Sequence, residues 1–265
     1  MFLNILKYLG IIIVLLVIAA LIIASVIRRE GDRMYARYDS YAREALAKNF
    51  QLQPYPIKAE FQYIAPWKAL KMFQFMVDSR QSDRLARINN IDATMFLCIR
   101  MYTLLLRPAY DYNLPMVSVD IIAIPGGKRV YVMEVIDPAR IDDANKKACY
   151  DKMRKLSAEL KGFAPVGVRD WFKDFVADVS IHANAKAEDD DKLLAIFQGY
   201  LDAYIEMTKN AQKLDAEQSR KVRQGFELYV TTLLEKGGPA VDVFKKLLGP
   251  EKQQEYIRTV MFGLE

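Results

Sequence analysis

Histidine, cysteine and the glycine-rich motifs of nucleotide-binding enzymes are scarce or missing in this chain of 265 residues. His182 is the only histidine, which disfavours a Ser-His-Asp triad and a multi-histidine metal site. Cys98 and Cys149 are the only cysteines. They form no zinc-binding spacing, fit a reducing compartment and are expected in the core. The motifs G-x-x-x-x-G-K-[ST], G-x-G-x-x-G, H-E-x-x-H and C-x-x-C are all absent from the sequence. The chain therefore carries none of the usual signatures of a hydrolase, a nucleotide-binding enzyme or a zinc protein.

A strong excess of charge is also missing. The chain has 38 basic and 33 acidic residues, a net charge of +5. A nucleic-acid-binding protein usually concentrates far more positive charge on one face, so no nucleic-acid partner is predicted. The mild basic balance suits a membrane surface or a small acidic electron carrier, and equally an ordinary solvated surface.

One long hydrophobic run is present near the start of the chain. Residues 8–27 contain no charge and are almost all aliphatic, and a helix of 20 residues spans about 30 Å, the thickness of a bilayer core. A cleaved signal peptide is the alternative, but the run is longer than a typical signal and lacks a small-x-small site. Five arginines follow the run, whereas only Lys7 precedes it. The positive-inside rule then predicts a single-pass membrane protein with its C-terminal part in the cytoplasm.

The pattern along the chain predicts three parts: an anchor over 1–27, a stalk helix and linker over 28–58, and a domain over 59–265. Glycine followed by proline at 237–239 and 249–250 indicates helix boundaries in the C-terminal region. Strands followed by helices favour an α+β fold. Within the apolar and aromatic stretch 60–77, Pro66 is predicted to start a helix around Trp67. The other predicted helices are 142–161, 189–213, 215–236, 239–248 and 250–262, and the predicted strands are 91–106, 116–124, 129–137 and 176–184.

Asp120 lies in the middle of an apolar strand that turns at Pro125-Gly126-Gly127 and returns as the second strand of a hairpin. An ionised carboxylate buried there is costly unless it is paired, neutralised or used. Burial raises the pKa of a carboxyl, and an acid that keeps its proton near neutral pH can serve as a proton donor. The alternative is a structural Asp120 bonded to the backbone or to Arg100.

Three blocks of residues resemble the ferredoxin-dependent bilin reductases, especially the phycocyanobilin:ferredoxin oxidoreductase type. The first is the turn with Tyr112, Leu114 and Pro115, followed by the strand with Asp120 and the Gly126-Gly127 turn. The second is the Trp171–Phe175 segment, which precedes a further strand. The third is the C-terminal stretch from Arg223 to Tyr256. Together these blocks extend the resemblance over roughly residues 80–265.

The resemblance implies a three-layer α/β/α sandwich with a central antiparallel sheet. It also implies the reduction of a linear tetrapyrrole such as biliverdin, with electrons from reduced ferredoxin and no bound cofactor or metal. By position, Asp120 matches the family's central proton donor. Thr103 stands where the family has a histidine, Ile91 stands where it has a glutamate, with Asp92 one residue away, and Gly237 stands where it has an asparagine.

The remaining candidate site residues are assigned by location. Arg100 and Arg129 are candidates for binding the propionates of the substrate, and Pro115 and Asp92 complete the expected substrate-binding set. His182 is either a structural imidazole or a residue near the ligand. The acidic run at 188–191 is expected to begin a helix rather than to bind a cation. Two other functions stay open: a non-catalytic tetrapyrrole-binding or assembly protein, and a protein that binds another flat hydrophobic ligand.

Overall fold

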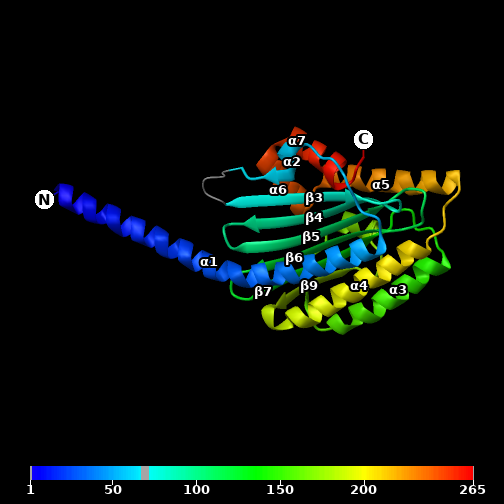
Figure 1. Ribbon diagram of the computed structural model, residues 1–265, viewed down its shortest axis with the longest axis horizontal. Helices are drawn as coiled ribbons and strands as arrows, with labels where there is room; N and C mark the ends of the chain where they lie inside the picture. Colours follow the sequence, from blue (N-terminus) through cyan, green and yellow to red (C-terminus); the bar gives the residue numbers. More distant parts are fainter. Residues whose placement is uncertain (1, 67–71, 265) are drawn as a thin grey trace.

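A computed structural model describes residues 2–66 and 72–264 (Figure 1). Its centre is a nine-stranded sheet in the order β1-β3-β4-β5-β6-β7-β9-β8, with β2 paired to β3 and every described pair antiparallel. The strands are β1 (Gln53–Pro54), β2 (Tyr63–Ile64), β3 (Phe73–Gln81), β4 (Leu85–Met95), β5 (Ile99–Pro108), β6 (Met116–Ile124), β7 (Lys128–Ile136), β8 (Ala164–Pro165) and β9 (Ile181–Lys186).

Helices cover both faces of the sheet. Gly237 and Gly249 end two of them with positive φ angles of 74° and 81°, and a proline opens the helix that follows each. The α-helices are α1 (Phe2–Asn49), α2 (Ala59–Gln62), α3 (Ala144–Ser157), α4 (Asp190–Asn210), α5 (Ala216–Lys236), α6 (Pro239–Leu248) and α7 (Pro250–Glu255). Shorter helical turns cover Ala158–Leu160, Asp170–Asp174, Ala187–Asp189 and Tyr256–Met261.

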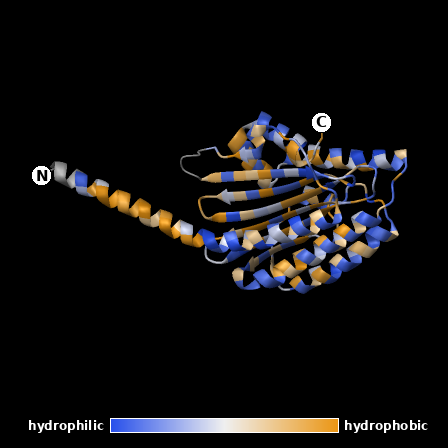
Figure 2. Ribbon diagram, in the orientation of Figure 1, coloured by the Kyte–Doolittle hydropathy of each residue, from blue (hydrophilic) through white to orange (hydrophobic). Residues whose placement is uncertain are grey.

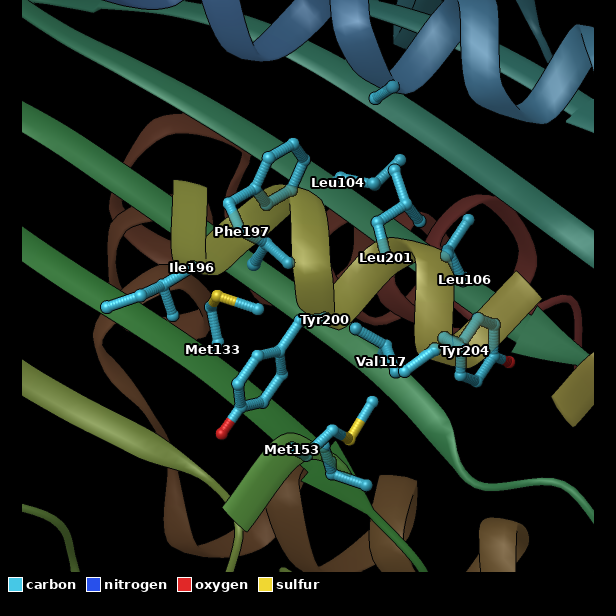
Figure 3. Packing of buried hydrophobic residues seen from close by; sticks show 14 of the residues in the cluster. Leu104, Leu106, Val117, Met133, Met153, Ile196, Phe197, Tyr200, Leu201 and Tyr204 are labelled. Carbon is cyan, nitrogen blue, oxygen red and sulfur yellow. The ribbon is translucent and has the colours of Figure 1, made fainter. Parts of the chain in front are cut away.

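The first face of the sheet packs against α1, α3 and α4. Alternate residues of β5, β6 and β7 point to this face, as the period of a strand requires, and they are almost fully buried. Figure 3 shows this packing, in which Phe197 and Leu201 of α4 lie over Leu104 and Val117 of the sheet.

The second face packs against α5, α6, α7 and the Tyr256–Met261 turn. Phe75 and Ile91 of the sheet share a second apolar cluster with Phe226, Phe244 and other residues of these helices. The two clusters make the molecule a three-layer α/β/α sandwich with a central antiparallel sheet, which confirms the predicted fold class.

Helix α1 is continuous from the hydrophobic run into the domain. Its first half projects from the sandwich and is coloured as hydrophobic over most of its length (Figure 2). Its apolar side chains are exposed, and it is long and apolar enough to cross a bilayer. Its second half buries Met34, Tyr38, Ala42 and Leu46 against the sheet and α4. Because this half contributes to the core, we propose that the domain begins within α1 rather than at residue 59.

Tyr38 tests how much this half of α1 contributes to stability. Its ring lies 5.0 Å from that of Phe197 and 5.9 Å from that of Tyr102, measured between centroids. Its buried hydroxyl has no hydrogen-bond partner among the described residues. We expect Tyr38→Ala to lower the free energy of unfolding by about 3–5 kcal/mol through the cavity it leaves. Tyr38→Phe removes only the unpaired hydroxyl and should leave stability unchanged or higher. Thermal unfolding in detergent compares the two variants, and equal losses would contradict the packing argument.

The sequence-based elements were partly wrong in the first half of the domain. The helix predicted to start at Pro66 around Trp67 falls partly on 67–71, outside the described residues, and from Phe73 onward the chain is strand β3. The strand predicted for 91–106 is two strands, β4 and β5, joined by a turn after Met95. The hairpin of β6 and β7 and the four C-terminal helical segments are confirmed within a few residues. Strand β9 begins at Ile181, five residues after the predicted start.

Candidate functional site

The strand register brings three of the predicted site residues into one row across the sheet. Thr103 of β5 pairs with Asp120 of β6, Asp120 pairs with Val132 of β7, and Val132 pairs with His182 of β9. Paired residues share a face, so all four side chains point to the second face. Neighbouring strands are about 4.8 Å apart, which sets Asp120 and His182 about 10 Å apart between Cα atoms.

Asp120 is held in a form suited to proton exchange. Burial raises the pKa of its carboxyl to about 6. The Thr103 hydroxyl donates a hydrogen bond to Oδ1, which opposes the rise by stabilising the ionised form. The charge of Glu134 acts in the opposite sense and raises the pKa further. The neighbouring side chains desolvate the carboxyl of Asp120, but the residue is not fully buried. A bound molecule can therefore still contact it.

Two further titratable residues lie beside Asp120, and neither was assigned to the site from the sequence. Glu134 Oε1 lies 3.1 Å from Nε2 of His182, with both side chains largely buried. Tyr229 of α5 is buried above them, and burial together with the charges of Glu134 and Asp120 raises the pKa of its hydroxyl well above the usual value. The rings of Phe172 and Tyr229 lie 6.1 Å apart, and the ring of Phe172 lies 6.5 Å from that of His182.

The helices leave part of this face without complete cover. On the first face the corresponding residues of β5, β6 and β7 are at most 5 % exposed, whereas around Asp120 the side chains are only half-buried. We call these residues the uncovered strip: Met101, Asp120, Ile122, Val130, Val132, Glu134 and His182. Four of them are apolar, so the strip is a partly accessible, largely apolar surface that also carries the acids Asp120 and Glu134.

Arg100 and Asp92 lie on the opposite face from Asp120. Arg100 Nη1 donates to Asp92 Oδ1 at 2.5 Å, and its Nε lies 2.6 Å from Asp32 Oδ1 of α1. Its guanidinium also lies 4.8 Å from the ring centroid of Tyr35. These contacts join the sheet to α1, so the structure does not bring the two residues together with the Asp120 row.

Arg129 and Pro115 are likewise separated from the row. Arg129 donates to Asp190 of α4 and to Glu30 of α1 on the first face. The carbonyl of Pro115 accepts a hydrogen bond from Tyr204 of α4 at 3.0 Å. Both residues are therefore engaged in contacts with the helices of the first face.

A separate hollow lies at the far end of the sandwich, where α1 ends. Its volume is about 690 Å³, and Asn49, Phe50, Arg84 and Lys209 are among the residues that line it. It contains no residue of the Asp120 row. Among residues 2–66 and 72–264, no group of three or more His, Cys, Asp or Glu side chains could hold a metal ion.

The chemistry available at the strip is proton transfer to a flat apolar molecule. A carboxyl with a pKa of about 6 can give up and regain a proton near neutral pH. The His182–Glu134 pair and the Tyr229 hydroxyl are within the same cluster and can exchange protons with it or with a bound molecule.

Comparisons with known proteins bear on this arrangement. A sequence profile described as ferredoxin-dependent bilin reductase matches residues 39–263. The phycoerythrobilin:ferredoxin oxidoreductase of Gloeobacter violaceus is 23 % identical over 242 residues, covering 88 % of this chain and 96 % of that protein. The corresponding protein of Prochlorococcus marinus (strain MIT 9211) is 21 % identical over 229 residues, covering 81 % of this chain and 88 % of that protein. These relatives carry the phycoerythrobilin name, whereas the sequence motifs pointed especially to the phycocyanobilin type.

A solved structure has the same fold. The crystal structure of phytochromobilin synthase from tomato in complex with biliverdin superimposes with a TM-score of 0.74 at 15 % identity. The match covers 86 % of this chain and 83 % of that one. The profile match extends from the second half of α1 to the C-terminal turn and so includes all three layers. The chain belongs to the ferredoxin-dependent bilin reductase family.

Proposed function

We propose that this protein is a membrane-anchored reductase that reduces a linear tetrapyrrole with electrons from ferredoxin. The observation that carries the proposal is the row formed by Asp120 and His182 of the uncovered strip and the buried Thr103 beside Asp120, with the pKa of Asp120 at about 6. Family membership and the biliverdin complex of a protein with the same fold support the choice of substrate class.

In this mechanism the pigment lies against the apolar strip with its pyrrole system over Asp120. Reduction of one double bond takes two electrons, delivered singly by reduced ferredoxin, and two protons. At pH 7 an acid with a pKa near 6 is protonated in about one molecule in ten, so Asp120 can deliver a proton and be recharged. The His182–Glu134 pair, which lies on β9 and β7 across the sheet from Asp120, is a candidate source for the second proton. The surrounding side chains restrict water, which favours protonation of the reduced pigment over side reactions.

The anchor belongs to the same proposal. Residues 8–27 would span the bilayer once, with the arginines that follow and the whole sandwich in the cytoplasm. The exposed apolar side chains of this part of α1 support this placement, because such a surface is costly in water.

The test uses the full chain in detergent or nanodiscs. We expect biliverdin to change its visible spectrum on mixing, which reports binding, and to change again when reduced ferredoxin is added without oxygen. A spectrum that changes on mixing but not on reduction would contradict the reductase. An unchanged spectrum on mixing would exclude tetrapyrrole binding altogether.

A second candidate function is a tetrapyrrole-binding or assembly protein without catalysis. The observation that favours it is Thr103, which occupies the place of the family's histidine and cannot carry a positive charge near neutral pH. The same experiment separates the two functions, because this candidate predicts binding without reduction.

Thr103 also gives a prediction about proton affinity. Thr103→Val keeps the shape of the strand residue but removes the hydrogen bond that stabilises the ionised Asp120. We expect the titration midpoint of Asp120 to rise above about 6 by roughly one to two pH units, from the strength of a hydrogen bond to a charged group. The carboxyl stretch in infrared difference spectra measures this midpoint. Thr94→Val is the matched control, since its hydroxyl contacts Arg100 on the other face, and an unmoved midpoint in Thr103→Val would contradict the prediction.

A further inference from the structure

The turn between β4 and β5 presents an apolar tip to solvent. Phe96 is 54 % exposed, and its ring packs edge-on against that of Phe73, with centroids 4.8 Å apart. Leu97 and Ile99 beside it are only half-buried. We propose that this tip, residues 96–99, inserts into the membrane interface next to the point where α1 leaves the bilayer. The inference rests on the proposed membrane span and adds a second point of contact with lipid.

The direction of α1 relative to β5 places the tip near the end of the apolar run, measured along the axis of α1. Gly31 of α1 lies against Arg100 of β5, since a Cβ at Gly31 would be 2.8 Å from the Arg100 side chain. Further along both elements, Tyr35 and Tyr38 contact Tyr102, so the helix and the strand run in the same direction. From Gly31 back to Ile27 the helix descends about 6 Å. From Arg100 back to Ile99 the strand descends about 3 Å, and the turn of residues 96–98, which joins the paired Met95 and Ile99, projects beyond that pair. The tip therefore lies near the height of Ile27, beside the last turn of the apolar run.

Two other observations agree with this height. Ala24 and Ile27 are half-buried, whereas the apolar residues of 21–23 are exposed, so the end of the domain begins to cover α1 within the apolar run. Figure 1 also shows α1 leaving the sandwich at the same end of the sheet as the turn that joins β4 to β5.

Two residues of the tip have a backbone conformation that is costly for residues with side chains. Their side chains are therefore expected to have a function. Phe96 and Leu97 have φ angles of 48° and 68°, in the left-handed region where glycine or asparagine is far less costly. Such a conformation is costly for a residue with a side chain. Burial of the exposed Phe96 ring in lipid would offset that cost.

Unpaired basic side chains lie at the same end of the sheet as the tip. Arg29, Arg33 and Lys128 are exposed and have no ion-pair partner among the described residues. The acids nearby, Glu30 and Asp32, are occupied by arginines of the sheet. An apolar tip within a basic rim is the composition that binds an anionic lipid surface. Its continuity with the span identifies lipid, rather than a protein, as the occupant.

Cys98 provides a native probe at the tip. It is half-buried and lies beside Phe96, contrary to the expected core position, whereas Cys149 is buried and its thiol has a pKa raised to about 12. A nitroxide reagent should therefore label Cys98 selectively in the full chain. In nanodiscs of anionic lipid we expect the label to collide several-fold more with oxygen than with a water-soluble nickel chelate. The variant Phe96→Asp should reverse this preference while the sandwich stays folded.

Two labelled variants in the Cys98→Ser background serve as controls. Lys48→Cys, at the far end of the same helix, should contact the nickel chelate, and Leu16→Cys should lie in lipid. A water-accessible label at both Leu16→Cys and Cys98 would refute the span and the inference together. A label in lipid at Leu16→Cys with a water-accessible Cys98 would refute the inference alone. Spin–spin broadening between tips in one disc would overturn the assignment to lipid in favour of a second copy of the chain.

Discussion

Asp120→Asn abolishes bilin reduction and makes the folded protein more stable above pH 6: this is the pair of outcomes that we expect from one substitution. The carboxamide can accept the hydrogen bond from Thr103 as the carboxylate does, but it cannot donate a proton to the pigment. Loss of a positioned general acid typically slows a reaction by 10²–10⁴-fold. Binding should survive, because the apolar residues of the strip are unchanged.

The gain in stability follows from the direction of the pKa shift. The carboxyl of Asp120 has a pKa of about 6 in the folded protein and an ordinary value of 3.8 otherwise, so the folded state holds this proton more tightly. The contribution of Asp120 to the free energy of unfolding is therefore highest below pH 3.8. It falls as the pH rises from 3.8 to 6 and stays reduced above pH 6. The shift corresponds to about 3 kcal/mol at most, and partial exposure of the side chain reduces this to roughly 1–3 kcal/mol. Asparagine removes this cost of ionisation.

Thermal unfolding of the wild type and Asp120→Asn at pH 5 and pH 8 measures this effect. The two proteins should differ more at pH 8 than at pH 5. Asp174→Asn, which changes an exposed acid on the same face, is the control and should leave both the reduction and the pH dependence as they are. Reduction at the wild-type rate by Asp120→Asn would contradict the role of Asp120 as proton donor. An equal difference in stability between the two proteins at pH 5 and pH 8 would contradict the raised pKa.

The sequence was sufficient to predict the hairpin that carries Asp120. Apolar residues on both sides of a Gly-Gly turn define β6 and β7, and the turn fixes their register. Strand β3 and the first half of β4 were missed because their burial depends on neighbours that are distant in the sequence. Residues 85–95 are polar in places, yet Asn89 is buried because its amide donates to the carbonyls of Val260 and Met261.

The alternation of side chains between the two faces of a strand explains why Arg100 and Arg129 do not join Asp120 in the site. Arg100 is three residues from Thr103, and Arg129 pairs with Ala123, which is three residues from Asp120. An odd separation in a strand means opposite faces, so both arginines had to point away from Asp120. The same parity places Glu134, two residues from Val132, on the face of Asp120. This signal was available in the sequence once the hairpin register was fixed, whereas the contribution of Tyr229 from α5 required the tertiary structure.

Arg129→Ala should destabilise the protein by about 3–5 kcal/mol without weakening the binding of a tetrapyrrole. The guanidinium is almost fully buried and makes two hydrogen bonds of 2.9 Å to Asp190 and one of 2.6 Å to Glu30. The acidic run predicted to begin a helix does so at α4, and Asp190 of this run depends on Arg129 for its charge balance. Removal of the cation leaves a largely buried carboxylate without a partner at the junction of β7, α1 and α4.

Two measurements on Arg129→Ala decide between a structural role and the sequence-based expectation that this residue binds a propionate. Thermal unfolding should show the loss of stability, and a biliverdin titration at a temperature where the variant is folded should give an unchanged dissociation constant. Arg154→Ala is the matched control, because its pairs with Asp151 and Asp178 are exposed and exposed pairs contribute little. A weakened affinity with unchanged stability would instead assign Arg129 to the ligand. The arrangement seen here favours the structural role, because Arg129 directs its donors to α1 and α4 on the face opposite Asp120.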